Sequence, residues 1–81
     1  MKYQIEIEPL ASRFVVAVKD PSTGDIRKCL AVNQTAADML RLKREGLDIP
    51  SISRTLSEQY GAPEDRIASD AEALFKKLGL D

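Results

Sequence analysis

Hydrophobic and polar residues alternate along the first part of the chain. In the segment YQIEIE, Tyr3, Ile5 and Ile7 fall on one face, and glutamine or glutamate residues fall on the other. The segments RFVVAVK and IRKCLAV alternate in a similar way, and the turn-forming run DPSTGD joins them. A period of two predicts strands, and turn formers between two strands predict a hairpin. We therefore predict strands at about residues 3–8, 13–19 and 26–32, with Pro9 ending the first.

The third predicted strand has two different faces, because successive side chains of a strand point in opposite directions. The alternation places the larger apolar residues and one lysine on the first face: Ile26, Lys28, Leu30 and Val32. Arg27, Cys29 and Ala31 form the second face.

After Asn33 the hydrophobic period changes to three and four residues, which is the period of an amphipathic helix. Asn33 and Asp48 have side chains that cap helix N-termini, and Gly46 and Gly61 are suited to end helices. Pro63 stands at the start of a third helix, followed by two acidic residues that suit the positive end of the helix dipole. These signals predict helices at about residues 34–45, 49–60 and 63–78.

Three strands followed by three helices in one short chain predict an α+β fold. We expect a single domain over residues 1–81, in which a three-stranded antiparallel sheet precedes three helices that cover one of its faces. The last helices resemble a helix-turn-helix. The predicted core consists of leucine and isoleucine residues: Leu30, Leu40, Ile52, Leu56, Ile67, Leu74 and Leu78.

The composition narrows the classes of function. Twelve basic and thirteen acidic side chains give the 81-residue chain a net charge of −1, whereas nucleic-acid-binding domains usually carry a basic excess. Cys29 is the only cysteine and the N-terminus is not of the signal type, so we expect a cytoplasmic protein without disulfides. No apolar run approaches the length of a membrane span, so we expect no membrane partner.

Residues that could carry catalysis are few. The chain has no histidine, the commonest general base and metal ligand. Cys29 has no histidine that could act as its base, and the adjacent Lys28 points to the opposite face of the strand. Carboxylates such as Asp38 and Glu58 are scattered, which is typical of a solvated surface rather than of a metal or glycosidase site. We therefore expect a non-enzyme with no catalytic residue, cofactor or metal.

The third predicted helix raises two questions, namely whether it could bind DNA and what role Asp70 has. As a recognition helix in the DNA major groove it would offer Arg66, Lys76 and Lys77, but four acidic residues on the same helix would face the phosphates unfavourably. Asp70 has poor helix propensity at its mid-helix position. It either pairs with Arg66 one turn earlier or serves in binding.

An ordered set of residues in the later part of the chain resembles the PqqD-like family, whose small proteins are named for pyrroloquinoline quinone biosynthesis. Family members show a strand that runs into Leu/Val-Asn-x-Thr-small-small. A glycine, a helix with buried Ile and Leu, an aromatic residue and a last helix with Asp and a Leu-Gly-Leu end then follow. The matching residues are Val32, Asn33, Thr35, Ala36, Ala37, Gly46, Ile52, Leu56, Tyr60, Asp70, Leu74, Leu78, Gly79 and Leu80. The resemblance implies a winged helix-turn-helix-like domain.

The resemblance also implies a function. PqqD-like domains, or RiPP recognition elements, bind the leader of a ribosomally made precursor peptide as an added strand and present it to a modifying enzyme. The implied groove lies between the third strand and the third helix and consists of Ile26, Arg27, Lys28, Cys29, Leu30, Ala31, Ile67, Asp70, Ala71 and Leu74. Small Ala71 would leave room for a peptide side chain, whereas Asn33 and Thr35 would form only the joint between strand and helix.

The expected partners follow from this resemblance. They are a leader peptide and a separate radical or cyclising enzyme. A free strand edge also permits a homodimer. Nucleic acid is not expected, and a DNA-binding winged helix is the alternative.

Overall fold

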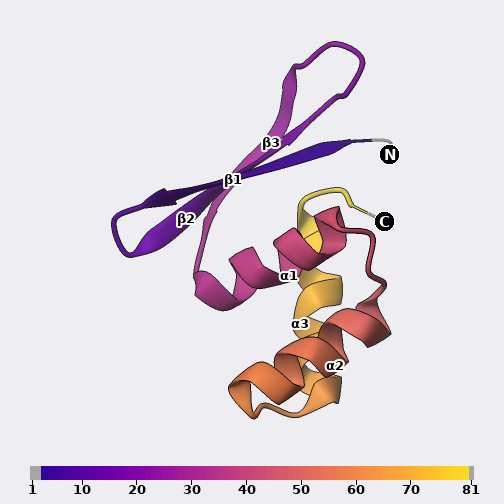
Figure 1. Ribbon diagram of the computed structural model, residues 1–81. Helices are drawn as coiled ribbons and strands as arrows, with labels where there is room; N and C mark the ends of the chain where they lie inside the picture. The colour runs from indigo at the N-terminus through magenta and orange to yellow at the C-terminus, as the bar shows by residue number, and fades with distance from the viewer. Residues whose placement is uncertain (1–2, 81) are drawn as a thin grey trace.

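The computed structural model describes residues 3–80, which form a three-stranded sheet followed by three helices (Figure 1). In chain order the elements are β1 (Gln4–Leu10), β2 (Arg13–Lys19), β3 (Ile26–Val32), α1 (Gln34–Arg44), α2 (Ile49–Tyr60) and α3 (Glu64–Lys77). This order confirms the predicted α+β fold of three antiparallel strands and three helices.

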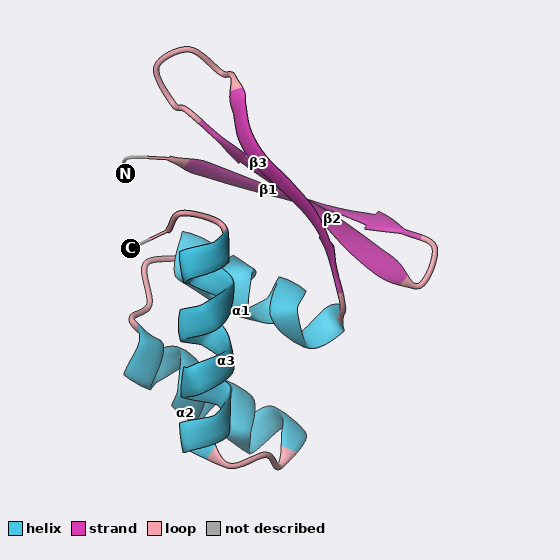
Figure 2. Ribbon diagram, turned by 180° about the vertical axis from the view of Figure 1, so that it is seen from behind, coloured by secondary structure: helices cyan, strands magenta, loops and turns pink. Residues whose placement is uncertain are grey.

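The sheet has β2 in its centre, and β1 and β3 form its two edges. All three helices lie on one side of the sheet in both views (Figures 1 and 2). Ile5, Val16 and Val18 are buried on the side that faces the helices. The opposite side, which carries Glu6 and Cys29, is open.

β1 continues through Pro9 to Leu10, so the prediction that Pro9 ends this strand is wrong. Pro9 pairs with Phe14 of β2. Proline lacks an N–H, and an edge strand tolerates it where that position faces away from the neighbouring strand. A turn at Ala11 and Ser12 follows, in which Ala11 has a positive φ of 57°.

β3 contains a bulge that changes the face on which Ile26 lies. Val18 pairs with Lys28, but Lys19 pairs with Ile26, so β3 has one residue more than β2 at this point. An extra residue shifts the alternation of side chains between the two faces. Ile26 therefore lies on the open face of the sheet beside Lys19, and the prediction that it shares a face with Leu30 is wrong.

The helices begin and end where the capping signals predict. Asn33 Oδ1 accepts a hydrogen bond from the Ala36 N–H at 2.9 Å, and Asp48 Oδ1 accepts one from the Ser51 N–H at 3.0 Å. Gly61 ends α2 in the left-handed conformation, with a φ of 70°. These caps fix the path of the chain from β3 through α2.

The core lies between the helices and the inner face of the sheet. Most of the predicted core residues are buried: Leu40, Ile52, Leu56, Ile67 and Leu78. Leu30 and Leu74 are only partly buried. The reason is that the helical layer packs on the sheet mainly through α1, which contacts β1 and β2. β3 and α3 therefore leave a space between them.

Candidate functional site

Three hollows follow one side of α3. The central hollow, about 200 Å³, is lined by Asn33, Thr35, Ala36, Met39, Asp70 and Leu74. The tyrosine hollow, about 270 Å³, lies toward the start of α3 and is lined by Asn33, Thr35, Met39, Tyr60, Ala62, Arg66, Ile67 and Asp70. The basic hollow, about 170 Å³, lies at the other end and is lined by Val18, Arg27, Lys28, Leu78 and Gly79. We call the three hollows together the α3 groove.

The α3 groove borders both ends of β3. Its first two hollows adjoin because they share lining residues, among them Asp70. Leu78 of the basic hollow lies one helical turn beyond Leu74 of the central hollow, so both face the same side of α3. Residues at the start of β3 line the basic hollow, and Asn33, directly after the end of β3, lines the central hollow.

The outer edge of β3 has no neighbouring strand. At the turn between β2 and β3, the Asp20 N–H donates a hydrogen bond to the Asp25 carbonyl at 2.9 Å. Because bonded pairs alternate along an antiparallel ladder, even-numbered residues of β2 bond to β3, and Leu30 lies opposite one of them. The backbone N–H and C=O groups of Cys29 and Ala31 therefore point outward, to the free edge.

The structure brings most of the predicted site residues to the groove or to this edge. Those that line the α3 groove are Arg27, Lys28, Ile67, Asp70 and Leu74. Cys29 and Ala31 are exposed on the β3 edge, and Leu30 between them is partly buried.

Two predicted site residues lie elsewhere. Ala71 is fully buried, with 0% exposure, because it packs in the core beneath α3. It therefore offers no free surface to a peptide, contrary to the prediction. Ile26 is exposed on the open face of the sheet, where it lines a separate hollow with the Cys29 side chain. The bulge in β3 is the cause of that difference.

Asn33 and Thr35 were predicted to be only a joint, but both line two hollows of the α3 groove. The cap explains this position. Because the Asn33 side chain bonds to the first turn of α1, the chain turns directly from β3 into the helix. The joint therefore forms the wall of the groove opposite α3.

Sequence reasoning missed a buried carboxylate, that of Asp38. Its side chain is 1% exposed and accepts hydrogen bonds from Gln34 Nε2 at 3.1 Å, Arg41 Nη2 at 2.5 Å and the Tyr60 hydroxyl. The prediction of a solvated residue is wrong, because Tyr60 at the end of α2 reaches back and covers it. The sequence does contain a signal for this burial, because Gln34 and Arg41 stand at helical spacing from Asp38 and can donate hydrogen bonds to it.

This cluster orients a residue of the groove. Tyr60 lines the tyrosine hollow and remains 43% exposed. The hydrogen bond to Asp38, and to a smaller extent desolvation, raises the pKa of the Tyr60 hydroxyl above its ordinary value of 10.0. The hydroxyl therefore stays protonated and donates to Asp38, which holds the side chain at the tyrosine hollow.

Asp70 is exposed and lines two hollows of the groove. Side-chain ion pairs are formed between Lys19 and Glu6 and between Arg41 and Asp38 in the described part of the chain. The helical pair between Arg66 and Asp70 is not formed, although both residues line the tyrosine hollow. The Asp70 carboxylate is thus available to a ligand.

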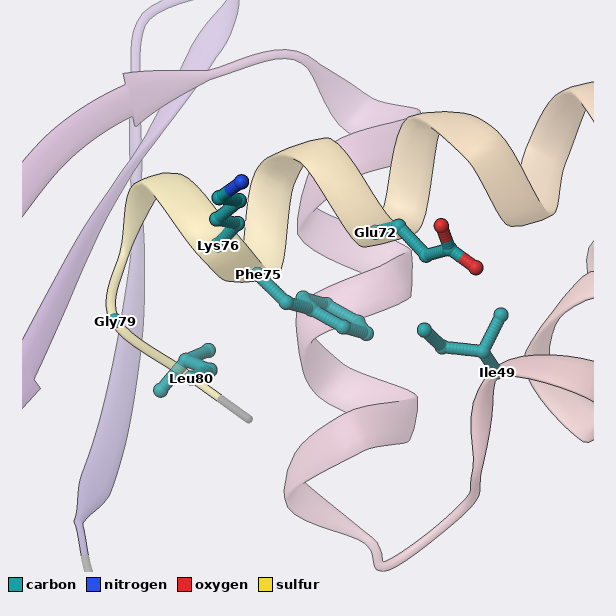
Figure 3. Close-up of a pocket in the computed structure, with 6 residues that line it drawn as sticks. All are labelled: Ile49, Glu72, Phe75, Lys76, Gly79 and Leu80. Atoms are coloured by element: carbon teal, nitrogen blue, oxygen red, sulfur yellow. The ribbon is translucent and has the colours of Figure 1, made fainter.

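A fourth hollow, about 300 Å³, lies on another side of α3 (Figure 3). Phe75 of α3 and Ile49 of α2 point toward one another across it, and Glu72 and Lys76 of α3 also line it. None of its lining residues belongs to a strand, so it offers no strand edge to an extended chain. Its size alone does not make it the better site.

Residues 3–80 meet neither the requirements of a metal site nor those of a membrane-spanning helix. They contain no group of His, Cys, Asp and Glu that could hold a metal ion. None of the described helices is long and apolar enough to cross a membrane. Cys29 is exposed as a free thiol. The arrangement instead suits an extended chain, which could bond to the β3 edge and place side chains in the α3 groove.

Known proteins show a similar arrangement. A family profile described as Coenzyme PQQ synthesis protein D (PqqD) matches residues 9–79. Among solved structures, TbiB1 in complex with the TbiA(beta) leader peptide has a similar fold. The TM-score is 0.67 over 98% of this chain and 88% of that chain, at 15% sequence identity. No curated protein matches the chain.

Proposed function

The chain belongs to the PqqD family, and from this premise we propose that it is a non-catalytic adaptor for a precursor peptide. It binds the leader segment of a ribosomally made peptide and presents it to a modifying enzyme of the radical or cyclising kind. The observation that supports this most is the free β3 edge beside the α3 groove. Backbone bonds to such an edge give affinity, and pockets for alternate side chains give specificity.

The outward groups of Cys29 and Ala31 form the ladder for the added strand. Alternate side chains of this strand then face the α3 groove or the open face of the sheet. An apolar side chain fits the central hollow, where Ala36 and Leu74 supply apolar surface. This burial gives the main side-chain contribution to affinity.

Opposite charges along the groove favour a peptide of mixed charge. Arg27 and Lys28 line the basic hollow and attract an acidic side chain. Asp70, which is nearer the start of α3 and lines the central and tyrosine hollows, attracts a basic one. Since these side chains are exposed, each pair contributes only about 0–1 kcal/mol. The charges therefore select direction and register more than they add affinity.

Filling the central hollow tests the proposal. Ala36→Phe places a ring where the peptide side chain would lie, and Ser69→Phe is the control, because Ser69 is exposed on α3 and lines none of the groove hollows. Losing the burial of one apolar side chain costs about 1.5–3 kcal/mol, or roughly 10- to 150-fold in Kd. The measurement is fluorescence anisotropy with a synthetic leader peptide encoded beside the gene. Equal Kd values for the two variants, both folded by circular dichroism, would refute this site.

The DNA-binding alternative makes a different prediction. Duplex binding would weaken steeply as salt rises, because each phosphate contact releases counterions. The charges of α3 argue against it, since Arg66 shares its hollow with Asp70. Tight, salt-sensitive binding to a duplex, in the absence of leader binding, would replace the adaptor proposal.

A further inference from the structure

The sheet has a second edge, formed by β1, which could also pair with an extended chain. A two-residue turn joins β1 to β2, and Leu10 pairs with Arg13 across it. Residues that flank such a turn bond to each other, and bonded pairs then alternate along the ladder. Even-numbered residues of β1 therefore bond to β2, and Ile5, Ile7 and Pro9 turn their backbone groups to the outer edge.

Two of these three outward positions are closed. Arg44, in the last turn of α1, donates a hydrogen bond from Nη1 to the Ile5 carbonyl at 3.2 Å. The bond occupies an acceptor that an added strand would need. Pro9 has no N–H, so it offers no donor there. Only Ile7 keeps both groups for a partner.

The β3 edge differs at each of these points. Its outward residues, Cys29 and Ala31, are not prolines, and both are exposed. No side chain in the described part of the chain bonds to their backbone groups. α1 packs against β1 and β2, so its arginine reaches one edge and leaves the other open.

We propose that Arg44 and Pro9 close the β1 edge to strand addition, so that the chain accepts an extended partner only at β3. The partner excluded at β1 is a second copy of this chain, whose own β1 would pair in antiparallel orientation about a twofold axis. The statement on β3 rests on the proposed function. The statement on β1 does not, and it can be tested without a leader peptide.

The test opens the β1 edge by the double substitution Arg44→Met and Pro9→Val. Methionine keeps an unbranched, apolar side chain without the donor, and valine restores the N–H. The control pair is Arg54→Met with Pro21→Val, because both residues are exposed and lie outside β1. Sedimentation equilibrium over a concentration series gives the dimer dissociation constant. We expect it to fall about tenfold or more in the edge variant, since a symmetric dimer gains each restored bond twice, and to stay unchanged in the control.

Amide hydrogen exchange locates the new contact. The Ile5 and Ile7 N–H groups should exchange fast in the parent and slow down as the edge variant associates. Arg44→Lys keeps a donor and should behave as the parent. If the double variant does not fold, Pro9→Val alone carries the test, with a smaller change in the same direction.

An edge variant that is folded and has the parent's mass at every concentration would overturn the proposal. Protection of the Ile7 amide in the parent by self-association would do the same. Leader binding is measured separately, with the parent and the variant diluted until both are monomeric. If the parent fails to bind the leader, the proposed function is wrong, whereas the result for the β1 edge still stands.

Discussion

Replacing Cys29 by proline should weaken leader binding while leaving the fold intact. The Cys29 N–H points to the free edge of β3, so β2 does not use it. Proline removes this donor, and its ring occupies the edge where the added strand would lie. Edge strands tolerate proline at such outward positions.

The magnitude follows from the bond that is lost. One backbone hydrogen bond contributes about 0.5–1.5 kcal/mol net, which is roughly 2- to 13-fold in Kd. Because the ladder with β2 is intact, the free energy of unfolding should change by less than about 1 kcal/mol. Leu30→Pro should do the opposite, since it removes the N–H that bonds to β2 and leaves the partner carbonyl unsatisfied, which costs about 1–3 kcal/mol.

The assay combines anisotropy titrations with urea unfolding. Cys29→Val is the matched control, because it changes the same side chain and keeps the N–H. If Cys29→Val weakens binding as much as Cys29→Pro, the side chain matters and the backbone ladder does not. If Leu30→Pro is the better tolerated proline, the assignment of outward and inward residues is reversed.

Three further results are expected. Leu56→Ala, at a side chain with 1% exposure, should lower the free energy of unfolding by about 2–5 kcal/mol in urea titrations, and a mild effect would mean that the α2 face is assigned wrongly. Because the pKa of Tyr60 is raised in the folded state, its contribution to stability is present below pH 10 and is lost as pH rises through the folded pKa. Absorbance titration of Tyr60 in a Tyr3→Phe background should show this raised pKa, and Asp38→Asn should lower it toward its ordinary value. Asp70→Asn should weaken a leader with a basic residue by up to about fivefold and leave an alanine-substituted leader unaffected.

The sequence was sufficient for the architecture because local signals agreed with one another. The caps at Asn33 and Asp48 and the left-handed Gly61 lie where the pattern predicts them. Strand alternation also separated Ile5 from the glutamate residues beside it, and Ile5 is buried in the structure. These features depend on residues close in sequence, which is why they can be predicted from it.

The details of the site were harder, because they depend on pairing between distant residues. A bulge is a property of two strands together, so nothing in IRKCLAV alone moves Ile26 to the open face. Pro9 ends a strand or continues it depending on whether that strand is an edge. Asp38 is buried by a tyrosine 22 residues later. Small size alone suggested that Ala71 is accessible, whereas helix packing buries it.

The most direct test of the central claim is amide-shift mapping of the ¹⁵N-labelled chain with the leader peptide encoded beside its gene. We expect the largest shifts at Cys29 and Ala31 on β3 and at Asp70 and Leu74 on α3, together with slowed exchange of the two β3 amides. Shifts confined to β1, or to the turn between α1 and α2, would contradict the β3 site even if the peptide bound.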